Sequence, residues 1–257
     1  MSGLTILLPP SETKREGGDD TRPFDLGALS FPELTSERVA VIAAARSVSS
    51  DDESARYALR LGPRSVGERL RNLSLEGAPT LPAVERYTGV LYDPLDASSA
   101  PPAVREWWHR HVIVQSAMFG PIAAGDPIPA YRLSHDARLG NLRLGSVWPG
   151  STVRALGSRG VDGVVLDLRS EGYRALGPVS GSVRLRVVSE GTDGRRRALN
   201  HWNKTAKGRL VSALGRAQIE PGSMSELADW ARTVGIGLDR TSDGWDLVAE
   251  TLEPATV

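Results

Sequence analysis

The chain has 257 residues, of which 31 are basic and 31 are acidic, and it contains no cysteine. This length suits one large domain, or two small ones, with a sizeable buried core. The absence of cysteine excludes disulfides, a thiolate nucleophile, an iron–sulfur cluster and a zinc–thiolate site. The zero formal charge argues against a protein that coats nucleic acid by charge alone.

The apolar segments indicate a protein that contacts no membrane. The apolar run at 39–45 is far shorter than the roughly 20 residues that a membrane span needs. The N-terminal run has no basic flank and is broken by Pro9 and Pro10, which is not the pattern of a signal peptide. We therefore expect a cytoplasmic, globular protein.

Lysine is rare among the basic residues. Of the 31 basic residues, 28 are arginine and three are lysine, at Lys14, Lys204 and Lys207. Lysine differs from arginine because its amine is compact and can lose its proton when it is desolvated. The three lysines therefore indicate positions where a guanidinium would not serve, with chance survival as the alternative.

The first predicted element is a buried strand that leads into a polar loop. The apolar run at 4–8 predicts the strand. The loop at 11–20 carries six charges and two glycines in ten residues. It is either a solvated connection or the lip of a site, because open α/β sheets bind ligands at the ends of central strands.

Residues 31–78 predict a helical subregion. Ser36 is a candidate N-cap for a first helix, and Asp51 or Asp52 for a second. Gly62 and Gly67 then form a turn that loosely matches a helix–hairpin–helix and would present backbone N–H groups to a phosphate. A plain turn between two helices is the alternative.

Two segments in the middle of the chain combine aromatic or rigid residues with polar ones. Residues 82–96 bring Tyr87, Thr88 and Gly89 together, although a buried aromatic pair would also explain this pattern. After a predicted strand at 112–119, three prolines fix an extended loop. This loop is expected to hold three polar side chains in place: Asp126, Tyr131 and Arg132.

A second buried strand is predicted at 163–168, and a polar turn follows it. The turn contains Asp167, Ser170 and Tyr173. It repeats the strand-then-polar-loop arrangement of the N-terminus. We therefore expect the two strand ends to share one crevice.

The stretch 184–216 is strongly basic, with nine basic and two acidic residues. It begins with a predicted strand at 183–188 and ends with a predicted helix at 200–214. Asn200, Lys204 and Lys207 would lie on one face of that helix, and Asn203 lies beside them. Amines near a helix N-terminus favour anion binding, and a solvated basic face is the alternative. The tail, 223–257, is expected to close the core.

No metal or cofactor site is expected from the motifs. The chain lacks a Walker loop, a dinucleotide fingerprint and a G-x-S-x-G elbow. His109 and His111 could share a face of a strand, but no carboxylate completes a metal site at ligand spacing.

Five of these segments together resemble the YaaA family of peroxide stress proteins. They follow in the family's order from Leu7 to about Leu214: LLPPSETK, PAVERYTGVLYDPLD, SAMFGPIAAGDPIPAYRL, DLRSEGYRALGP and NHWNKTAKGRL. The resemblance implies a single mixed α/β domain over residues 1–257, of unusual topology, with a helix–hairpin–helix element and a positively charged cleft. It also implies a cytoplasmic protein of the oxidative stress response that binds DNA and limits free intracellular iron.

The resemblance assigns the family's motifs to particular residues. The matching elements lie at 11–14, 87–90, 119–132, 167–173 and 204–208. Glu12 and Thr13 replace the Pro-Ala pair of the family's S-P-A-K-T element, and Asp167 and Arg169 depart in detail from its late strand end. The departures at Glu12 and Arg169 alter the charge expected in the cleft.

The first functional hypothesis is a stress protein that binds DNA. The basic stretch 184–216 would contact phosphates, and the turn at 62–67 would present backbone amides. Affinity should then fall steeply as salt rises.

The second hypothesis is an enzyme that acts on a nucleotide-like or nucleobase-like anion. Lys14, Lys204 or Lys207 would be an amine of lowered pKa, with Asp126 or Asp167 as the acid/base partner. The ligand would be bound by a wider set: Ser11, Tyr87, Thr88, Gly89, Tyr131, Arg132, Ser170, Tyr173, Asn203 and Lys207. Both hypotheses expect Lys14 to meet Lys204 and Lys207 in one positive hollow, and a scaffold without turnover is a third alternative. Nothing in the sequence pattern predicts an oligomeric state.

Overall fold

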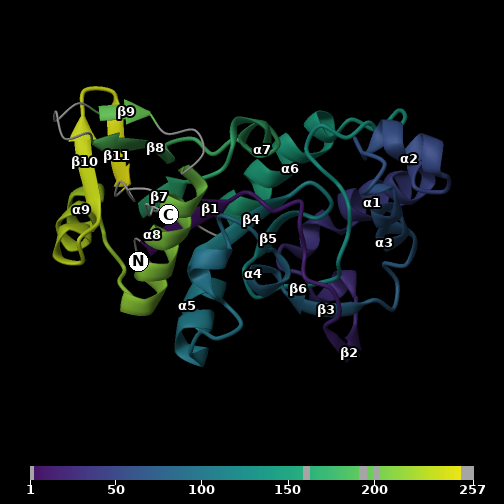
Figure 1. Cartoon of the computed structure of the whole chain (residues 1–257), viewed down its shortest axis with the longest axis horizontal. Coiled ribbons are helices and arrows are strands. Elements are labelled where there is room, and N and C mark those ends of the chain that lie inside the picture. Colours follow the sequence, from purple (N-terminus) through teal and green to yellow (C-terminus); the bar gives the residue numbers. More distant parts are fainter. Residues whose placement is uncertain (1–2, 159–162, 191–195, 199–202, 250–257) are drawn as a thin grey trace, which may run out of the picture.

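The computed structural model describes residues 3–158, 163–190, 196–198 and 203–249. Eight strands form one mixed sheet: β1 (Gly3–Leu8), β4 (Val112–Ser116), β5 (Gly120–Ala123), β7 (Gly163–Asp167), β8 (Val183–Glu190), β9 (Arg196–Ala198), β10 (Gly237–Thr241) and β11 (Gly244–Ala249). Seven of them follow the order β10-β11-β8-β7-β1-β4-β5, and β9 pairs with β8 (Figure 1). The sheet takes strands from both ends of the chain, so the chain forms a single α/β domain, as predicted.

The centre of the sheet is parallel. β1 lies between β4 and β7, and Ile6 stands opposite Val112 on one side and Leu166 on the other. These strands are apolar on both faces, as expected where helices cover both sides of a parallel sheet. The predicted strands at 4–8, 112–119 and 163–168 are therefore confirmed in their cores. The strand order reverses between β1 and β7, which is where such sheets bind ligands.

The helices surround this sheet. They are α1 (Thr35–Val48), α2 (Asp52–Ala58), α3 (Leu70–Leu73), α4 (Ala83–Arg86), α5 (Pro102–His111), α6 (Leu144–Ser158), α7 (Glu171–Ala175), α8 (Asn203–Ala217) and α9 (Met224–Thr233). Short 3-10 turns are η1 (Leu26–Ala28), η2 (Pro32–Leu34), η3 (Val66–Arg69) and η4 (Asp93–Leu95). A small second sheet has the order β2 (Asp19–Pro23), β3 (Pro79–Pro82) and β6 (Pro127–Ile128). Among the residues that the structure describes, no helix is long and apolar enough to cross a membrane.

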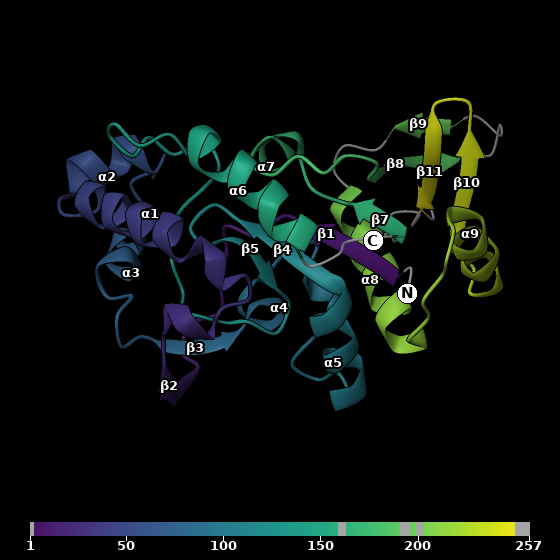
Figure 2. The same ribbon diagram turned by 180° about the vertical axis from the view of Figure 1, so that it is seen from behind.

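Two layers of helices bury the two faces of the sheet. On one face, Leu7 and Val165 pack with Leu156 of α6, the helix in front in Figure 2. On the other face lie α5 and α8, which are joined where the Trp108 indole N–H donates to the Val211 carbonyl at 3.1 Å. This second layer fixes α8 beneath the carboxyl ends of the central strands, and thereby positions the site.

The helical subregion predicted at 31–78 contains α1, α2, η3 and α3. Ser36 is not the N-cap of the first helix, because η2 runs directly into α1 and Leu34 holds that position. Asp51 caps α2 as predicted, its carboxylate accepting from the Ser54 N–H at 2.9 Å. After the turn at Gly62 the chain forms only η3 and the four-residue α3. The α-helical part of the segment that would complete a helix–hairpin–helix is therefore only four residues long.

Candidate functional site

A cavity of about 1080 Å³ lies at the carboxyl ends of β1 and β7. Pro9, Pro10 and Ser11 line it directly after β1, and residues 168–170 line it directly after β7. The predicted crevice shared by the two strand ends is thus a cavity of the structure. The start of α8 and the loop at 89–92 close its other sides.

β8 forms one wall of the cavity because it extends past the end of β7. The parallel register pairs Asp167 with Arg184, so the part of β8 from Leu185 onward has no β7 residue beside it. Residues 184–187 line the cavity there. β11 pairs with the same part of β8 and adds Trp245 and Asp246 to the lining.

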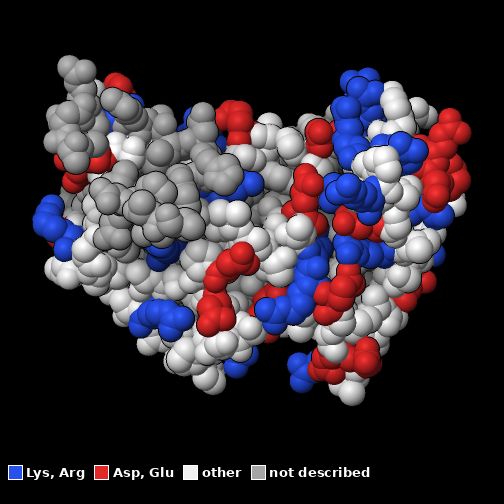
Figure 3. Space-filling view, in the orientation of Figure 1, with Lys and Arg blue, Asp and Glu red and all other residues white. Residues whose placement is uncertain are grey.

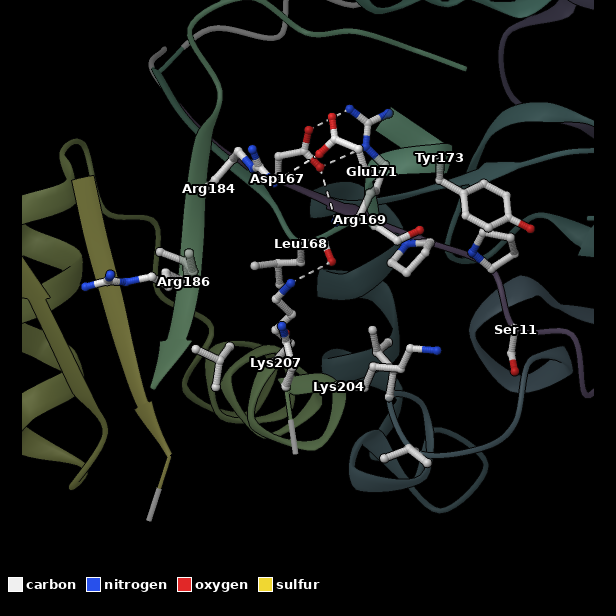
Figure 4. Close-up of a pocket in the computed structure, with 18 of the residues that line it drawn as sticks. Ser11, Asp167, Leu168, Arg169, Glu171, Tyr173, Arg184, Arg186, Lys204 and Lys207 are labelled. Atoms are coloured by element: carbon white, nitrogen blue, oxygen red, sulfur yellow. Dashed lines mark hydrogen bonds and ion pairs between the residues drawn. The ribbon is translucent and has the colours of Figure 1, made fainter. Parts of the chain in front are cut away.

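Two lysines of α8 face this space (Figure 4). Lys207 is only 9% exposed, and its Nζ donates to the Leu168 carbonyl at 3.3 Å. Burial lowers the pKa of Lys207 to about 8, and although the charge of Asp167 opposes the shift, nearby cations such as Arg184 add to it. Lys204, almost one turn earlier in α8, is exposed and extends toward the side where Ser11 lies.

Close packing of α8 holds these lysines in place. A Cβ at Gly208 would lie 2.2 Å from the Leu91 carbonyl oxygen, so only glycine permits the helix to approach this loop. Leu91 itself lines the cavity. The helix is therefore seated directly against the loop that forms the opposite wall.

Asp167 is held in a buried network of ion pairs. Arg169 donates from Nε to one carboxylate oxygen at 2.8 Å and from Nη2 to the other at 2.7 Å. Both side chains are 1% exposed, and Arg174 adds a third contact at 3.3 Å. The carboxylate at the end of β7 is thus engaged by Arg169, which lines the cavity, and by Arg174, which does not.

The other arginines near the cavity also have carboxylate partners. Arg184 pairs with Glu171 at 3.2 Å, and Arg186 pairs with Asp246 through contacts of 2.7 and 2.9 Å. Acidic and basic side chains are interspersed on the described part of the face shown in Figure 3. Arg184 and Arg186, at the start of the basic stretch, are thus paired with carboxylates. Arg195 and Asn200 of that stretch lie outside the described residues.

Lys14 lies behind the lip of the cavity. Ser11, Glu12 and Thr13 line the cavity, whereas Lys14 does not and is 7% exposed. Its Nζ donates to the Ser11 carbonyl at 2.9 Å and to the Glu12 carbonyl at 3.3 Å. Burial, followed by the charge of Arg132, lowers the pKa of Lys14 to about 7.

Aromatic residues surround Lys14. Its Nζ is 4.1 Å from the centre of the Tyr131 ring and 5.5 Å from that of Tyr87. The two tyrosine hydroxyls are 2.8 Å apart, and the Tyr131 hydroxyl is also 2.8 Å from Ser116 Oγ. Arg132 forms an ion pair with Glu12, a residue of the cavity lip, at 2.9 Å.

The sequence matches a known family across most of its length. A family model described as peroxide stress protein YaaA covers residues 4–235. The chain belongs to the YaaA family. It is 41% identical to a UPF0246 protein of Corynebacterium efficiens over 92% of this chain and 95% of that relative. It is 36% identical to a UPF0246 protein of Streptomyces coelicolor over 90% of each chain.

In this YaaA-family chain, the cavity gathers part of the predicted site. The predicted residues that line it are Ser11, Gly89, Asp167, Ser170, Tyr173, Asn203, Lys204 and Lys207. The predicted residues that do not line it are Lys14, Tyr87, Thr88, Asp126, Tyr131 and Arg132. The hollow expected to hold all three lysines thus contains Lys204 and Lys207, with Lys14 behind its lip.

Asp126 lies at a structural junction outside the cavity. Its carboxylate accepts from the Ser30 N–H at 2.9 Å, the Ser30 hydroxyl at 2.7 Å and the Ala123 N–H at 3.0 Å. Burial raises the pKa of Asp126 in spite of these hydrogen bonds. In the YaaA fold its contacts join the η1–η2 connection to the end of β5.

Several cavity residues were not singled out as site residues from the sequence. Trp245 and Asp246 belong to the tail that was expected only to close the core, and His135 was given no role from the sequence. His109 and His111 lie on α5 rather than on a strand, so they point in different directions. Across the described ranges, no group of three or more His, Asp or Glu side chains is arranged to hold a metal ion.

Proposed function

We propose that the cavity binds a small, anionic, nucleotide-like ligand, and that this binding is the cytoplasmic role of the chain in the peroxide stress response. The observation that carries the proposal is the charge state of the wall. Lys204 and Lys207 line the cavity, and neither has a carboxylate ion-pair partner among the described residues. The neighbouring arginines, in contrast, are already paired. The two amines are therefore the cations available to an incoming anion.

The start of α8 supports an anion at this end of the cavity. Asn203 and Lys204 are the first residues of the helix, and both line the cavity. The free backbone N–H groups and the dipole of a helix N-terminus favour a negative group. A phosphate beside Lys204 would receive both interactions.

Two aromatic side chains lie on another side of the cavity, tilted by 42° to one another. The rings of His135 and Tyr173 lie 4.9 Å apart, and both residues line the cavity (Figure 4 labels Tyr173). Aromatic rings of this kind can stack with a base. The cavity volume of about 1080 Å³ is slightly above the roughly 300–1,000 Å³ typical of small-molecule sites, so the cavity has room for a nucleotide.

The enzyme hypothesis fits the same pocket. A buried amine with a pKa near 8 is partly neutral at neutral pH, and can therefore act as a base or a nucleophile. Lys207 is the residue that combines this property with a place in the cavity lining. Catalysis by Lys207 would require that the cavity first bind the ligand.

DNA binding is the second candidate. The observation that favours it is the exposure of two arginines at the cavity: the side chains of Arg184 and Arg186 are 60% and 58% exposed. Together with Lys204 they could contact successive phosphates of a strand, and the turn at 62–67 could add backbone N–H groups. Such binding would weaken strongly with salt.

Calorimetric titration separates these functions. We expect a nucleoside monophosphate to bind at least about tenfold more tightly than the same nucleoside without phosphate, since a charge-assisted contact contributes about 1.5–3 kcal/mol. Lys204→Ala should lose about that factor of affinity. The matched control Arg232→Ala removes a cation that is 73% exposed on α9 and should bind as the wild type does.

Two outcomes would change the conclusion. Equal affinity for the nucleoside and its monophosphate would exclude an anion site in the cavity. Binding of duplex or single-stranded oligonucleotides that falls steeply between 50 and 200 mM salt, without mononucleotide binding, would establish the second candidate instead.

A further inference from the structure

Lys207 differs from the other two lysines in combining burial with access to the cavity. Its amine lines the cavity and contacts only the Leu168 carbonyl oxygen among the hydrogen-bond acceptors of the described residues. Lys14 is equally buried but lies behind the lip, against Tyr87 and Tyr131. Lys204 lines the cavity but is exposed. One amine is therefore both desolvated and in reach of a ligand.

The composition of the chain indicates that this position needs an amine. Arginine occupies 28 of the 31 basic positions, including the neighbours Arg169, Arg174 and Arg184. A guanidinium would hold an anion at least as well, because it stays charged and can donate two parallel hydrogen bonds. It could not supply a neutral nitrogen. Lysine at 207 is therefore better explained by chemistry at Nζ than by charge.

The amine is also held in a defined position. Its contact with the Leu168 carbonyl fixes one N–H at 3.3 Å, directly after the end of β7. Gly208 seats α8 against Leu91 and so limits movement of the helix. Because one N–H is directed at the strand, the lone pair of the neutral amine is free to face the cavity.

We propose that Nζ of Lys207 forms an imine with the aldehyde carbon of a ring-opened ribose or deoxyribose phosphate bound in the cavity. This rests on the proposed function, with the phosphate placed beside Lys204. An intact nucleotide carries no free carbonyl, so the reactive ligand is the sugar phosphate without its base. It is either free or an abasic residue within a strand.

The reaction balances without a further reactant. The lone pair of neutral Lys207 attacks the aldehyde carbon, and the carbonyl π electrons move to its oxygen. Both protons of the amine leave with that oxygen as water, and a carbon–nitrogen double bond remains. The pKa near 8 makes a fraction of the amine neutral at physiological pH, whereas an ordinary lysine is almost fully charged.

Reductive trapping with mass spectrometry tests the assignment. The full chain is incubated with 2-deoxyribose 5-phosphate and cyanoborohydride, and in parallel with an oligonucleotide that contains one abasic site. We expect an adduct at Lys207 at least about tenfold above that at Lys204, because burial lowers the pKa of Lys207 to about 8 and leaves a larger fraction of its amine neutral. The compound that gives the Lys207 adduct at the lower concentration, either the free sugar phosphate or the abasic oligonucleotide, identifies the source of the sugar.

Variants and pH make the test specific. Lys207→Arg should abolish the adduct at position 207. Thermal unfolding shows whether this variant is folded, and titration with a nucleoside monophosphate shows whether it still binds the ligand. Arg232→Lys adds an exposed lysine on α9 as a control, and no adduct is expected at position 232. The rate of trapping should rise through about pH 8, following deprotonation of Lys207.

The outcomes distinguish this inference from the proposed function. Nucleoside monophosphate binding without a Lys207 adduct would overturn the imine and leave the binding site intact. Equal adducts at Lys204 and Lys207 would also overturn it. Loss of ligand binding altogether would remove the proposed function on which the inference rests.

Discussion

The amine of Lys14 lies over the ring of Tyr131, with Nζ 4.1 Å from the ring centre. The same amine donates to the carbonyls of Ser11 and Glu12, two residues that line the cavity. Lys14 thus connects the aromatic cluster of the interior to the lip of the cavity. A cation–π contact and two hydrogen bonds offset part of the cost of burying this group.

Burial of Lys14 makes stability depend on pH. The pKa of Lys14 is about 7 in the folded chain and about 10.5 when unperturbed, so between these values the unfolded state binds more protons. The free energy of unfolding should then rise with pH by up to about 1.4 kcal/mol per pH unit from this residue, and fall as pH drops toward 7. Lys14→Met should lose this rise in urea unfolding at pH 7 and 9. The matched control is Lys204→Met, which removes an exposed lysine and should keep the rise of the wild type. If Lys14→Met showed the same rise in the free energy of unfolding with pH as the wild type, burial of Lys14 would not be its cause.

The ion pair of Asp167 with Arg169 should be needed for folding. Asp167→Asn keeps the shape of the side chain but leaves the buried Arg169 guanidinium without its carboxylate. We expect the free energy of unfolding to fall by about 3–5 kcal/mol. Glu171→Gln, which removes an 80% exposed partner of Arg174, should cost under about 1 kcal/mol. If Asp167→Asn and Glu171→Gln lowered the free energy of unfolding equally in chemical denaturation, burial would not determine how much each ion pair contributes.

Local sequence rules predicted the centre of the site. The apolar runs ending at Leu8 and Leu168 indicated two strands with polar ends, and parallel strands bring such ends to one edge. The place of Lys14 could not be predicted this way, because its loop folds back to form a bridge with Tyr87. The contribution of Trp245 and Asp246 depends on β11 pairing with β8, which are about 60 residues apart in sequence. No local pattern specifies that pairing.

Asp126 is expected to support the fold rather than the ligand. Asp126→Asn replaces an acceptor of three hydrogen bonds by an amide, so that donors from Ser30 and Ala123 face an N–H group. The free energy of unfolding should fall by about 1–3 kcal/mol, whereas Asp229→Asn on the surface of α9 should be nearly neutral. Nucleoside monophosphate affinity, measured by calorimetry, should change by less than about twofold because the residue lies outside the cavity. A large loss of affinity with unchanged stability would instead show that Asp126 takes part in ligand binding.

Gly208 should be required for the seating of α8. In Gly208→Ala the new Cβ would collide with the Leu91 backbone, so the helix must shift by an amount that moves Lys204 and Lys207. We expect a loss of about 1–3 kcal/mol in thermal unfolding together with weaker nucleotide binding. Gly150→Ala, in the middle of α6, meets only the end of Arg154 at 3.6 Å and should stabilise the chain by about 0.5–1 kcal/mol. Two variants of equal stability would show that α8 is not tightly seated.

A crystal structure of the chain with a nucleoside monophosphate would show directly whether the cavity binds this ligand. We expect phosphate density beside Lys204 at the start of α8, with the amine of Lys207 within reach of the ligand. Phosphate density confined to the exposed faces of Arg184 and Arg186, or an empty cavity at saturating ligand, would contradict this expectation.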